Sequence, residues 1–266
     1  MTQHRISTVI SPRLPKAETN MRFAVIADVH GNYLALEAVL ADICAQDVGE
    51  IVNLGDMASG PLDARRAMDA LMALDAVHVL GNHDRWLIDR PVEKMGSWDR
   101  PAHAQLEARH LDWLRAVPKT AVFRDQVFLC HATPADDNVY WLETVTPDGS
   151  VRMSPLEAIE KEAEGVSQSL ILCAHTHIAR AVRLGDGRLV VNPGSVGGPG
   201  FSYNVPFPHL IEAGTPDARY AVLELADASW RVTFRHVPYD HDAMAALARR
   251  NGDAEFASAL STGWIR

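Results

Sequence analysis

Residues 21–32 read MRFAVIADVHGN, an apolar run followed at once by a polar turn. The run Met21–Ala27 is short and continuous, which is typical of a strand buried on both faces of a sheet. Apolar residues then recur at helical spacing from Leu34 to Leu40. The stretch therefore predicts a strand, a polar turn and a helix, which together form one unit of an α/β fold.

The same unit recurs twice in the following fifty residues. Apolar runs at 51–54 and 76–80 end in Gly55-Asp56 and in Gly81-Asn82-His83-Asp84, and a helical pattern covers about 62–74 between them. This alternation predicts a parallel sheet, whose ligands gather at the carboxyl ends of the strands.

The second half of the chain has a more antiparallel pattern. Apparent hairpins cover 181–191 and 219–237, and further strands are expected at 119–124, 126–130 and 170–173. Helices are expected at 103–116, from about Ser154, and after Asp240. We therefore predict the α/β class, with two packed mixed sheets flanked by helices.

Length and composition limit the alternatives. A chain of 266 residues with 47% hydrophobic content can bury one sizeable core. The net charge of −9 argues against a general nucleic-acid-binding protein, because such proteins carry an excess of basic residues. Residues 1–20 contain no long apolar stretch, so we expect a loose N-terminal arm, one domain over 21–266, no membrane segment and a cytoplasmic location.

Histidine and acidic residues cluster at five predicted strand ends. In chain order these ends deliver Asp28 and His30, Asp56, Asn82 and His83, His131, and finally His175 and His177. Strand ends that share one edge of a sheet bring such side chains together. Members of each pair two residues apart would also point the same way on an extended segment.

Mixed imidazole and carboxylate donors suit borderline transition metals, namely manganese, iron, zinc, cobalt or nickel. A magnesium site would use fewer imidazoles and more water. Two ions need a shared carboxylate, and Asp56 stands alone on the middle strand end. Asp56 is therefore the expected bridge.

The ordered series D-x-H, G-D, G-N-H-D, a lone His and H-x-H over 28–177 resembles the signature of the calcineurin-like metallophosphoesterases. Asn192-Pro193-Gly194-Ser195-Val196-Gly197 further resembles a segment of the bacterial branch that includes YfcE-like phosphodiesterases. The resemblance implies a four-layer α/β/β/α sandwich.

The resemblance also implies roles for individual residues. One divalent ion would be held by Asp28, His30 and His177, and the other by Asn82, His131 and His175, with Asp56 shared. Manganese is the favoured metal, and iron, zinc, nickel and cobalt are alternatives. A hydroxide between the ions would attack phosphorus while His83 protonates the departing oxygen. Asp84 would be the acidic partner that orients or tunes His83.

Departures from the family pattern bear on the substrate. Residues 55–60 read GDMASG and lack the Arg with which protein Ser/Thr phosphatases grip a phosphomonoester. A small phosphodiester or nucleotide-like substrate is therefore favoured. A phosphomonoesterase or phosphoprotein phosphatase, and a non-catalytic metal-binding interaction module, are the alternatives.

Some assignments stay open from the sequence alone. Asp84 could instead cap the helix that begins near Trp86. Residues 192–216 are rich in Gly, Pro and aromatics, so we expect a long loop, with an insertion at about 198–217. Its Gly-rich start lacks the GK[ST] of a phosphate cradle and is interpreted as a turn that shapes the metal site. Candidates for the wall of a substrate pocket are Arg85, Tyr140, Trp141, Phe201 and Tyr203.

Overall fold

The computed structural model describes residues 21–266, so the predicted arm at 1–20 lies outside the described residues. The first half contains β1 (Met21–Ile26), α1 (Tyr33–Ala45), β2 (Ile51–Asn53), α2 (Ala64–Met72), β3 (Ala76–His78), α3 (Asn82–Asp89), the 3₁₀ helix η1 (Val92–Lys94), α4 (Asp99–His103), α5 (Ala108–Ala116), β4 (Thr120–Phe123) and β5 (Val127–Cys130).

The second half contains β6 (Glu143–Val145), β7 (Val151–Met153), α6 (Leu156–Glu162), β8 (Leu170–Leu172), β9 (Arg180–Arg183), β10 (Leu189–Asn192), β11 (Gly200–Tyr203), β12 (His209–Glu212), β13 (Ala218–Ala226), β14 (Ser229–Val237), α7 (His241–Arg250) and α8 (Ala254–Thr262). None of the helices within residues 21–266 has the length and apolar character needed to cross a membrane.

Two five-stranded mixed sheets form the centre of the fold. The first has the order β14-β13-β1-β2-β3, in which β1, β2 and β3 are parallel and β13 and β14 are antiparallel additions. The second has the order β4-β5-β8-β10-β9, with β5, β8 and β10 parallel and an antiparallel strand at each edge. Both sheets thus have parallel strands whose carboxyl ends can carry a site.

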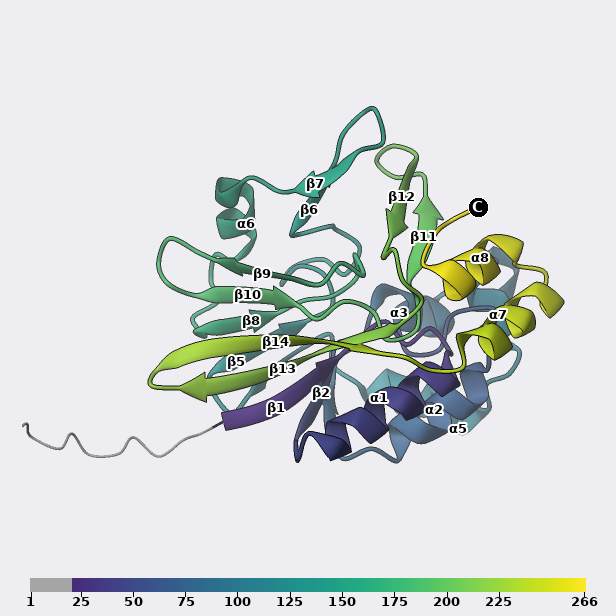
Figure 1. Ribbon diagram of the computed structural model, residues 1–266, viewed down its shortest axis with the longest axis horizontal. Coiled ribbons are helices and arrows are strands. Elements are labelled where there is room, and N and C mark those ends of the chain that lie inside the picture. The colour runs from purple at the N-terminus through teal and green to yellow at the C-terminus, as the bar shows by residue number, and fades with distance from the viewer. Residues whose placement is uncertain (1–20) are drawn as a thin grey trace, which may run out of the picture.

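Alternating side chains of β1 face two different layers. Phe23 and Val25 belong to the apolar core between the two sheets, whereas Ala24 and Ile26 pack with residues of α1 and α2. On the far side of the second sheet, Ile171 packs with residues of α6. Figure 1 shows the resulting layers, with α1, α2 and α5 outside one sheet and α6 outside the other. The predicted four-layer sandwich is confirmed.

The helix predicted over 103–116 is wrong in one respect. The chain forms α4 and α5 with a break between them, because a new helix start is stabilised at residue 107. The backbone N–H of Glu107 donates to Nδ1 of His110 at 2.8 Å, which satisfies a donor that a helix start leaves unpaired.

The loop expected over 192–216 is also partly wrong, because it contains the β11–β12 hairpin. Buried His209 anchors the hairpin, since its Nδ1 donates to the carbonyl of Phe207 at 2.7 Å and its Nε2 lies 3.0 Å from the Tyr140 hydroxyl. At Gly200 a Cβ would lie 2.8 Å from the carbonyl oxygen of Ile211. The close pairing of the two strands therefore depends on glycine at this position.

Candidate metal centre

The structure brings all the predicted ligand side chains to one edge of the two sheets. Two groups have ligand atoms within 4.8 Å of one another, namely Asp28 with His30 and His177, and Asp56 with His131 and His175. Oδ1 of Asn82 lies 3.0 Å from Nε2 of His131, which places it beside the second group. These groups match the division expected from the resemblance.

The backbone at these ligands is not extended. Five of them adopt positive φ angles, which are Asp28 (53°), His30 (50°), Asp56 (54°), His175 (70°) and His177 (59°). The expectation that each pair lies on an extended segment is therefore wrong, although both members of each pair reach the centre. A non-glycine residue in an unfavourable region costs on the order of 1–3 kcal/mol, and such costs concentrate at functional sites.

Backbone carbonyls orient three of the imidazoles. Nδ1 of His30, His131 and His177 lies 2.7 Å from the carbonyl oxygens of Ser59, Leu54 and Gly198 respectively. A ring that donates from Nδ1 keeps Nε2 available as a metal ligand. Each tautomer is thus set by the chain itself.

His175 is oriented in the opposite sense. Its Nε2 lies 3.0 Å from the carbonyl oxygen of Asn138, so Nδ1 is the ring nitrogen left for a ligand bond. Burial lowers the pKa of His175 to about 3 and that of His30 to about 4. Both rings are therefore neutral at physiological pH, as metal ligation requires.

Asp28 is the strongest sign that the centre fits a cation. Its carboxylate is fully buried, and neither oxygen has a hydrogen-bond partner among residues 21–266. Burial raises the pKa of Asp28 well above its ordinary value. A buried carboxylate is costly unless a positive charge accompanies it.

The neighbouring imidazoles point to the same conclusion. Nε2 of His30 lies 3.1 Å from Nε2 of His177, although Nδ1 of each ring is committed to a carbonyl oxygen. Two nitrogen lone pairs would then face each other, which a cation or a proton between them would relieve. The donor set of carboxylate and imidazole fits a divalent transition metal.

Asp56 lies between the two groups. Its Oδ1 accepts the backbone N–H of His83 at 2.9 Å, and its Oδ2 lies 3.2 Å from Nε2 of His131 and 4.0 Å from Nε2 of His30. Burial opposes the charge of His131, but the carboxylate of Asp56 outweighs it and raises the pKa of His131 to about 10. The Oδ2 atom thus faces one imidazole of each group, as a shared ligand would.

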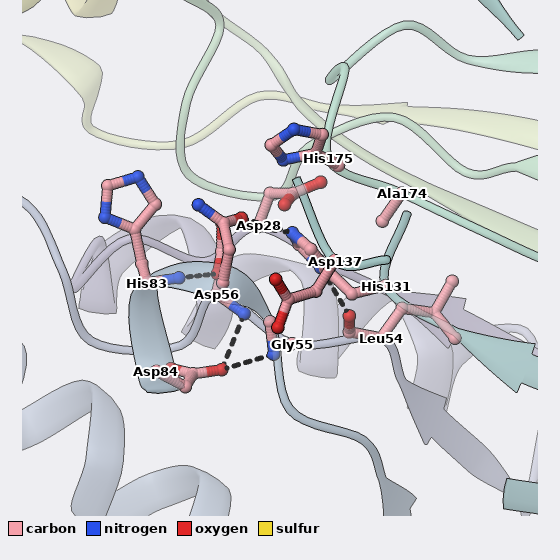
Figure 2. Close-up of polar contacts among 12 residues, drawn as sticks. Asp28, Leu54, Gly55, Asp56, His83, Asp84, His131, Asp137, Ala174 and His175 are labelled. Atoms are coloured by element: carbon pink, nitrogen blue, oxygen red, sulfur yellow. Dashed lines mark hydrogen bonds and ion pairs between the residues drawn. The ribbon is translucent and has the colours of Figure 1, made fainter. Parts of the chain in front are cut away.

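Asp84 does not contact the imidazole of His83. Its Oδ2 accepts the backbone N–H groups of Asp56 and Gly81, and its Oδ1 accepts that of Met57, at 2.8–3.0 Å. Figure 2 shows this carboxylate turned towards the Asp56 backbone and away from the His83 ring. Asp84 therefore does not orient the His83 ring, although its charge contributes to raising the pKa of His83. The alternative of Asp84 as the N-cap of a helix that begins near Trp86 is also wrong, because α3 begins at Asn82 with Gly81 as its N-cap and Asp84 is the third helical residue.

Asp99 occupies the place expected for Asp84. Its Oδ1 lies 2.6 Å from Nδ1 of His83, and its side chain is only 2% exposed. Burial opposes a charge on His83, but Asp56 and Asp99 outweigh it, so the pKa of His83 is raised. No sequence pattern signals this contact, because Asp99 follows a separate turn at the start of α4.

The segment 192–198 packs against the backbone of the first ligand segment. The Ser195 hydroxyl donates to the carbonyl oxygen of Asp28 and accepts the backbone N–H of Gly198, both at 2.7 Å. At Gly197 a Cβ would lie 1.8 Å from the carbonyl oxygen of Val29, so a side chain is excluded. The interpretation of this segment as a structural turn is confirmed.

A cavity of about 370 Å³ opens over the centre. Besides the ligands and His83, its lining includes the aromatic side chains Trp86, Trp98, Tyr140, Phe201 and Tyr203. Two expected pocket residues lie elsewhere. Arg85 donates from Nε and Nη2 to the carboxylate of Asp137 and lines a neighbouring cavity, and Trp141 is buried in the core.

Residues 21–210 match the calcineurin-like phosphoesterase superfamily domain. The chain belongs to this superfamily. The match covers most of the chain and all seven predicted metal ligands, from Asp28 to His177.

Solved structures agree with the superfamily assignment. A metallophosphoesterase from Sphaerobacter thermophilus is 26% identical, with a TM-score of 0.69 over 92% of this chain and 100% of its own. A hypothetical protein from Pyrococcus horikoshii is 18% identical, with a TM-score of 0.71 over 92% of this chain and 99% of its own, and shows the same fold. YfcE from E. coli, a phosphoesterase, is 17% identical, with a TM-score of 0.42 over 82% of this chain and 100% of its own.

A sequence relative agrees as well. An uncharacterised protein of Methanocaldococcus jannaschii is 25% identical over 198 residues, which cover 66% of this chain and 76% of the relative. Membership of the superfamily supports a phosphoesterase, and the two His/Asp groups could hold divalent metal ions.

Proposed function

We propose that the protein is a binuclear metal-dependent phosphoesterase that hydrolyses a phosphodiester or a nucleotide-like phosphate ester. The observation that supports this most directly is the position of Asp56, whose Oδ2 faces His30 from one group and His131 from the other. A carboxylate shared in this way is what holds two ions about 3.5–4 Å apart.

The first ion would be held by Asp28, His30 and His177, and the second by Asn82, His131 and His175, with Asp56 common to both. Divalent ions there would neutralise the phosphoryl oxygens and make water acidic enough to react near neutral pH. Manganese is the favoured occupant. The high share of imidazole also suits iron, zinc, nickel and cobalt.

His83 is the proposed general acid. Its Nδ1 is committed to Asp99 at 2.6 Å, so Nε2 is the nitrogen that carries a proton to the substrate. The carboxylates of Asp56 and Asp99 raise the pKa of His83, which favours the protonated ring that a general acid needs. His83 also lines the cavity, where the departing oxygen of an ester would lie.

The charges around the cavity favour a diester over a monoester. A phosphomonoester dianion is usually held by a bidentate Arg, whereas a diester carries a single negative charge. Among the described residues that line this cavity, Arg90 is the single Arg or Lys, and its guanidinium is stacked 3.7 Å from the ring centre of Trp86. A monoester would therefore find no free guanidinium beside the metals.

The proposal is tested by comparing hydrolysis of bis-p-nitrophenyl phosphate with that of p-nitrophenyl phosphate. Activity should disappear after chelation, return with manganese, and stay absent in Asp56→Asn. A higher rate with the diester would support the proposed substrate class. Faster monoester turnover would favour a phosphatase, and absence of hydrolysis despite verified metal occupancy would favour a binding module.

A further inference from the structure

Two indoles and a guanidinium form the wall of the cavity beside His83. The ring centre of His83 lies 4.6 Å from that of Trp86 and 6.1 Å from that of Trp98. The guanidinium of Arg90 lies 3.7 Å from the ring centre of Trp86, and all three side chains line the cavity. We call Trp86, Arg90 and Trp98 the indole wall.

Contacts outside the cavity hold the indole wall in place. Nε1 of Trp98 donates to Oδ2 of Asp253 at 3.0 Å, and its ring centre lies 4.6 Å from that of Phe256. Trp86 and Arg90 are four residues apart on α3 and its end, where side chains stack on one helix face. A surface fixed in advance binds a ligand without first losing conformational entropy.

The leaving group must depart next to the acid that protonates it. With His83 as the acid, the group attached to the departing oxygen lies against the indole wall. Phe201 and Tyr140, on other sides of the cavity, pack on the predicted metal ligands His177 at 4.8 Å and His175 at 5.2 Å and not on His83, whereas Trp98 lies near both His30, at 5.1 Å, and His83. The indole wall is thus the surface nearest to the leaving group.

Two polar atoms of the indole wall and its surroundings are already bonded to neighbouring side chains. Nε1 of Trp98 is bonded to Asp253, and Oδ1 of Asp99 is bonded to His83. The indole and guanidinium planes attract the face of an aromatic ring.

We propose that the alcohol released by this enzyme carries a flat aromatic ring that stacks on the indole wall. The proposal rests on the proposed function, since it requires His83 to be the acid. Such an alcohol is either a nucleoside or a simple aryl alcohol. The cavity of about 370 Å³ falls in the range of small-molecule sites.

The test measures binding of the alcohols themselves. Manganese-loaded wild-type protein is titrated calorimetrically with adenosine, phenol and D-ribose. We expect an aromatic probe to bind at least about tenfold more tightly than ribose. Tighter binding of adenosine than of phenol identifies a nucleoside, and similar binding of both identifies an aryl alcohol.

Variants test whether the preference for aromatic probes over ribose arises from the indole wall. Trp86→Leu keeps apolar volume without the ring, so it should abolish the preference for aromatic probes. Arg90→Gln is a second, more exposed variant and should lower aromatic affinity about two- to fivefold. Trp264→Leu is the matched control, because this indole is 45% exposed and does not line the cavity.

Equal affinity for ribose and the aromatic probes would overturn the inference, as would an unchanged preference in both Trp86→Leu and Arg90→Gln. Hydrolysis of bis-p-nitrophenyl phosphate by the same wild-type preparation separates the two proposals. Hydrolysis without an aromatic preference removes the inference and keeps the function. Absence of hydrolysis removes both.

Discussion

Nδ1 of His83 lies 2.6 Å from Oδ1 of Asp99, a residue 16 positions further along the chain. The two side chains meet because α3 and α4 pack together beside the cavity. Asp99 is nearly buried, so its carboxylate acts on His83 with little screening by solvent. This pair fixes which nitrogen of His83 faces the substrate.

Asp99→Asn should lower kcat about 10–100-fold, by analogy with the carboxylate partners that orient metal-binding imidazoles. Removing the negative charge lowers the pKa of His83, because Asp99 contributes to raising it. The alkaline limb of the pH–rate profile should therefore move to lower pH. Measuring kcat from pH 5 to 9 checks this, with exposed Asp112→Asn as control. An unshifted profile would leave Asp99 a purely structural residue.

His83→Ala should keep both metals and lose turnover in a way that depends on the leaving group. General acid catalysis contributes about 10²–10⁴-fold, and it matters most for poor leaving groups. We expect that loss with an alkyl ester, and a much smaller loss with a p-nitrophenyl ester. Rates for both esters, with metal content from elemental analysis, test the prediction. Equal losses for both esters would remove His83 as the acid.

Chelation should lower the melting temperature, because a ligand that binds only the folded state stabilises it. At 100 times the dissociation constant this amounts to about 2.7 kcal/mol, or roughly 5–10 °C for a domain of this size. Calorimetry with and without manganese measures the shift. A melting temperature independent of metal would contradict the proposed centre.

Asp28→Asn should have opposite effects in the two states. Without metal, the neutral amide removes an unpaired buried carboxylate, so the variant should melt at or above the chelated wild type. Addition of manganese should raise the melting temperature of the variant by less than it raises that of the wild type. A variant that gains as much from manganese as the wild type would show that Asp28 is not a ligand.

Arg85→Ala should weaken metal binding although Arg85 contacts no ligand. Arg85 holds Asp137 through two hydrogen bonds, and the neighbouring carbonyl of Asn138 orients His175. Loss of this support should lower affinity for one manganese ion by about 10–100-fold. Calorimetric titration of the chelated protein measures it, and Arg115→Ala, an exposed ion pair within α5, is the control. Unchanged affinity for both ions would refute the link.

Asp42→Asn should reduce stability in a pH-dependent way. Hydrogen bonds from Arg235, and also from Tyr220, hold the pKa of Asp42 below its ordinary value. Stabilisation by such a carboxylate is present above the ordinary pKa of about 3.9 and is lost as the pH falls through the lowered value. The variant should melt roughly 2–4 °C lower at pH 7, with a difference that shrinks below about pH 4. Melting curves at pH 3 and 7 test this prediction. An equal difference in melting temperature between wild type and variant at both pH values would exclude the charge of Asp42 as its cause.

The ligands themselves are predictable from the sequence. Each follows a short apolar run whose length and flanking turn residues favour a buried strand, and parallel strands end at a common edge. The pattern alone therefore groups Asp28, Asp56 and His131. It does not predict the backbone conformation at these ligands, because positive φ angles depend on how each strand end packs against the next.

The partner of His83 shows the limit of sequence reasoning. Asp84 is adjacent in sequence, but its side chain lies over the start of α3 and there satisfies backbone donors. Asp99 reaches His83 from another helix. Similarly, Trp98 joins Trp86 beside the cavity only because α4 folds back on α3.

The sequence by itself thus determined most of the strands and helices, the two packed mixed sheets flanked by helices, and the residues that can hold metal. These follow from local patterns of apolar and polar residues, and the family resemblance added the four-layer arrangement. Only the tertiary structure decided the partner of His83, the hairpin at β11 and β12 and the wall beside the acid. The physical reason is that such contacts join residues from separate elements, and their distances are set by packing rather than by spacing along the chain.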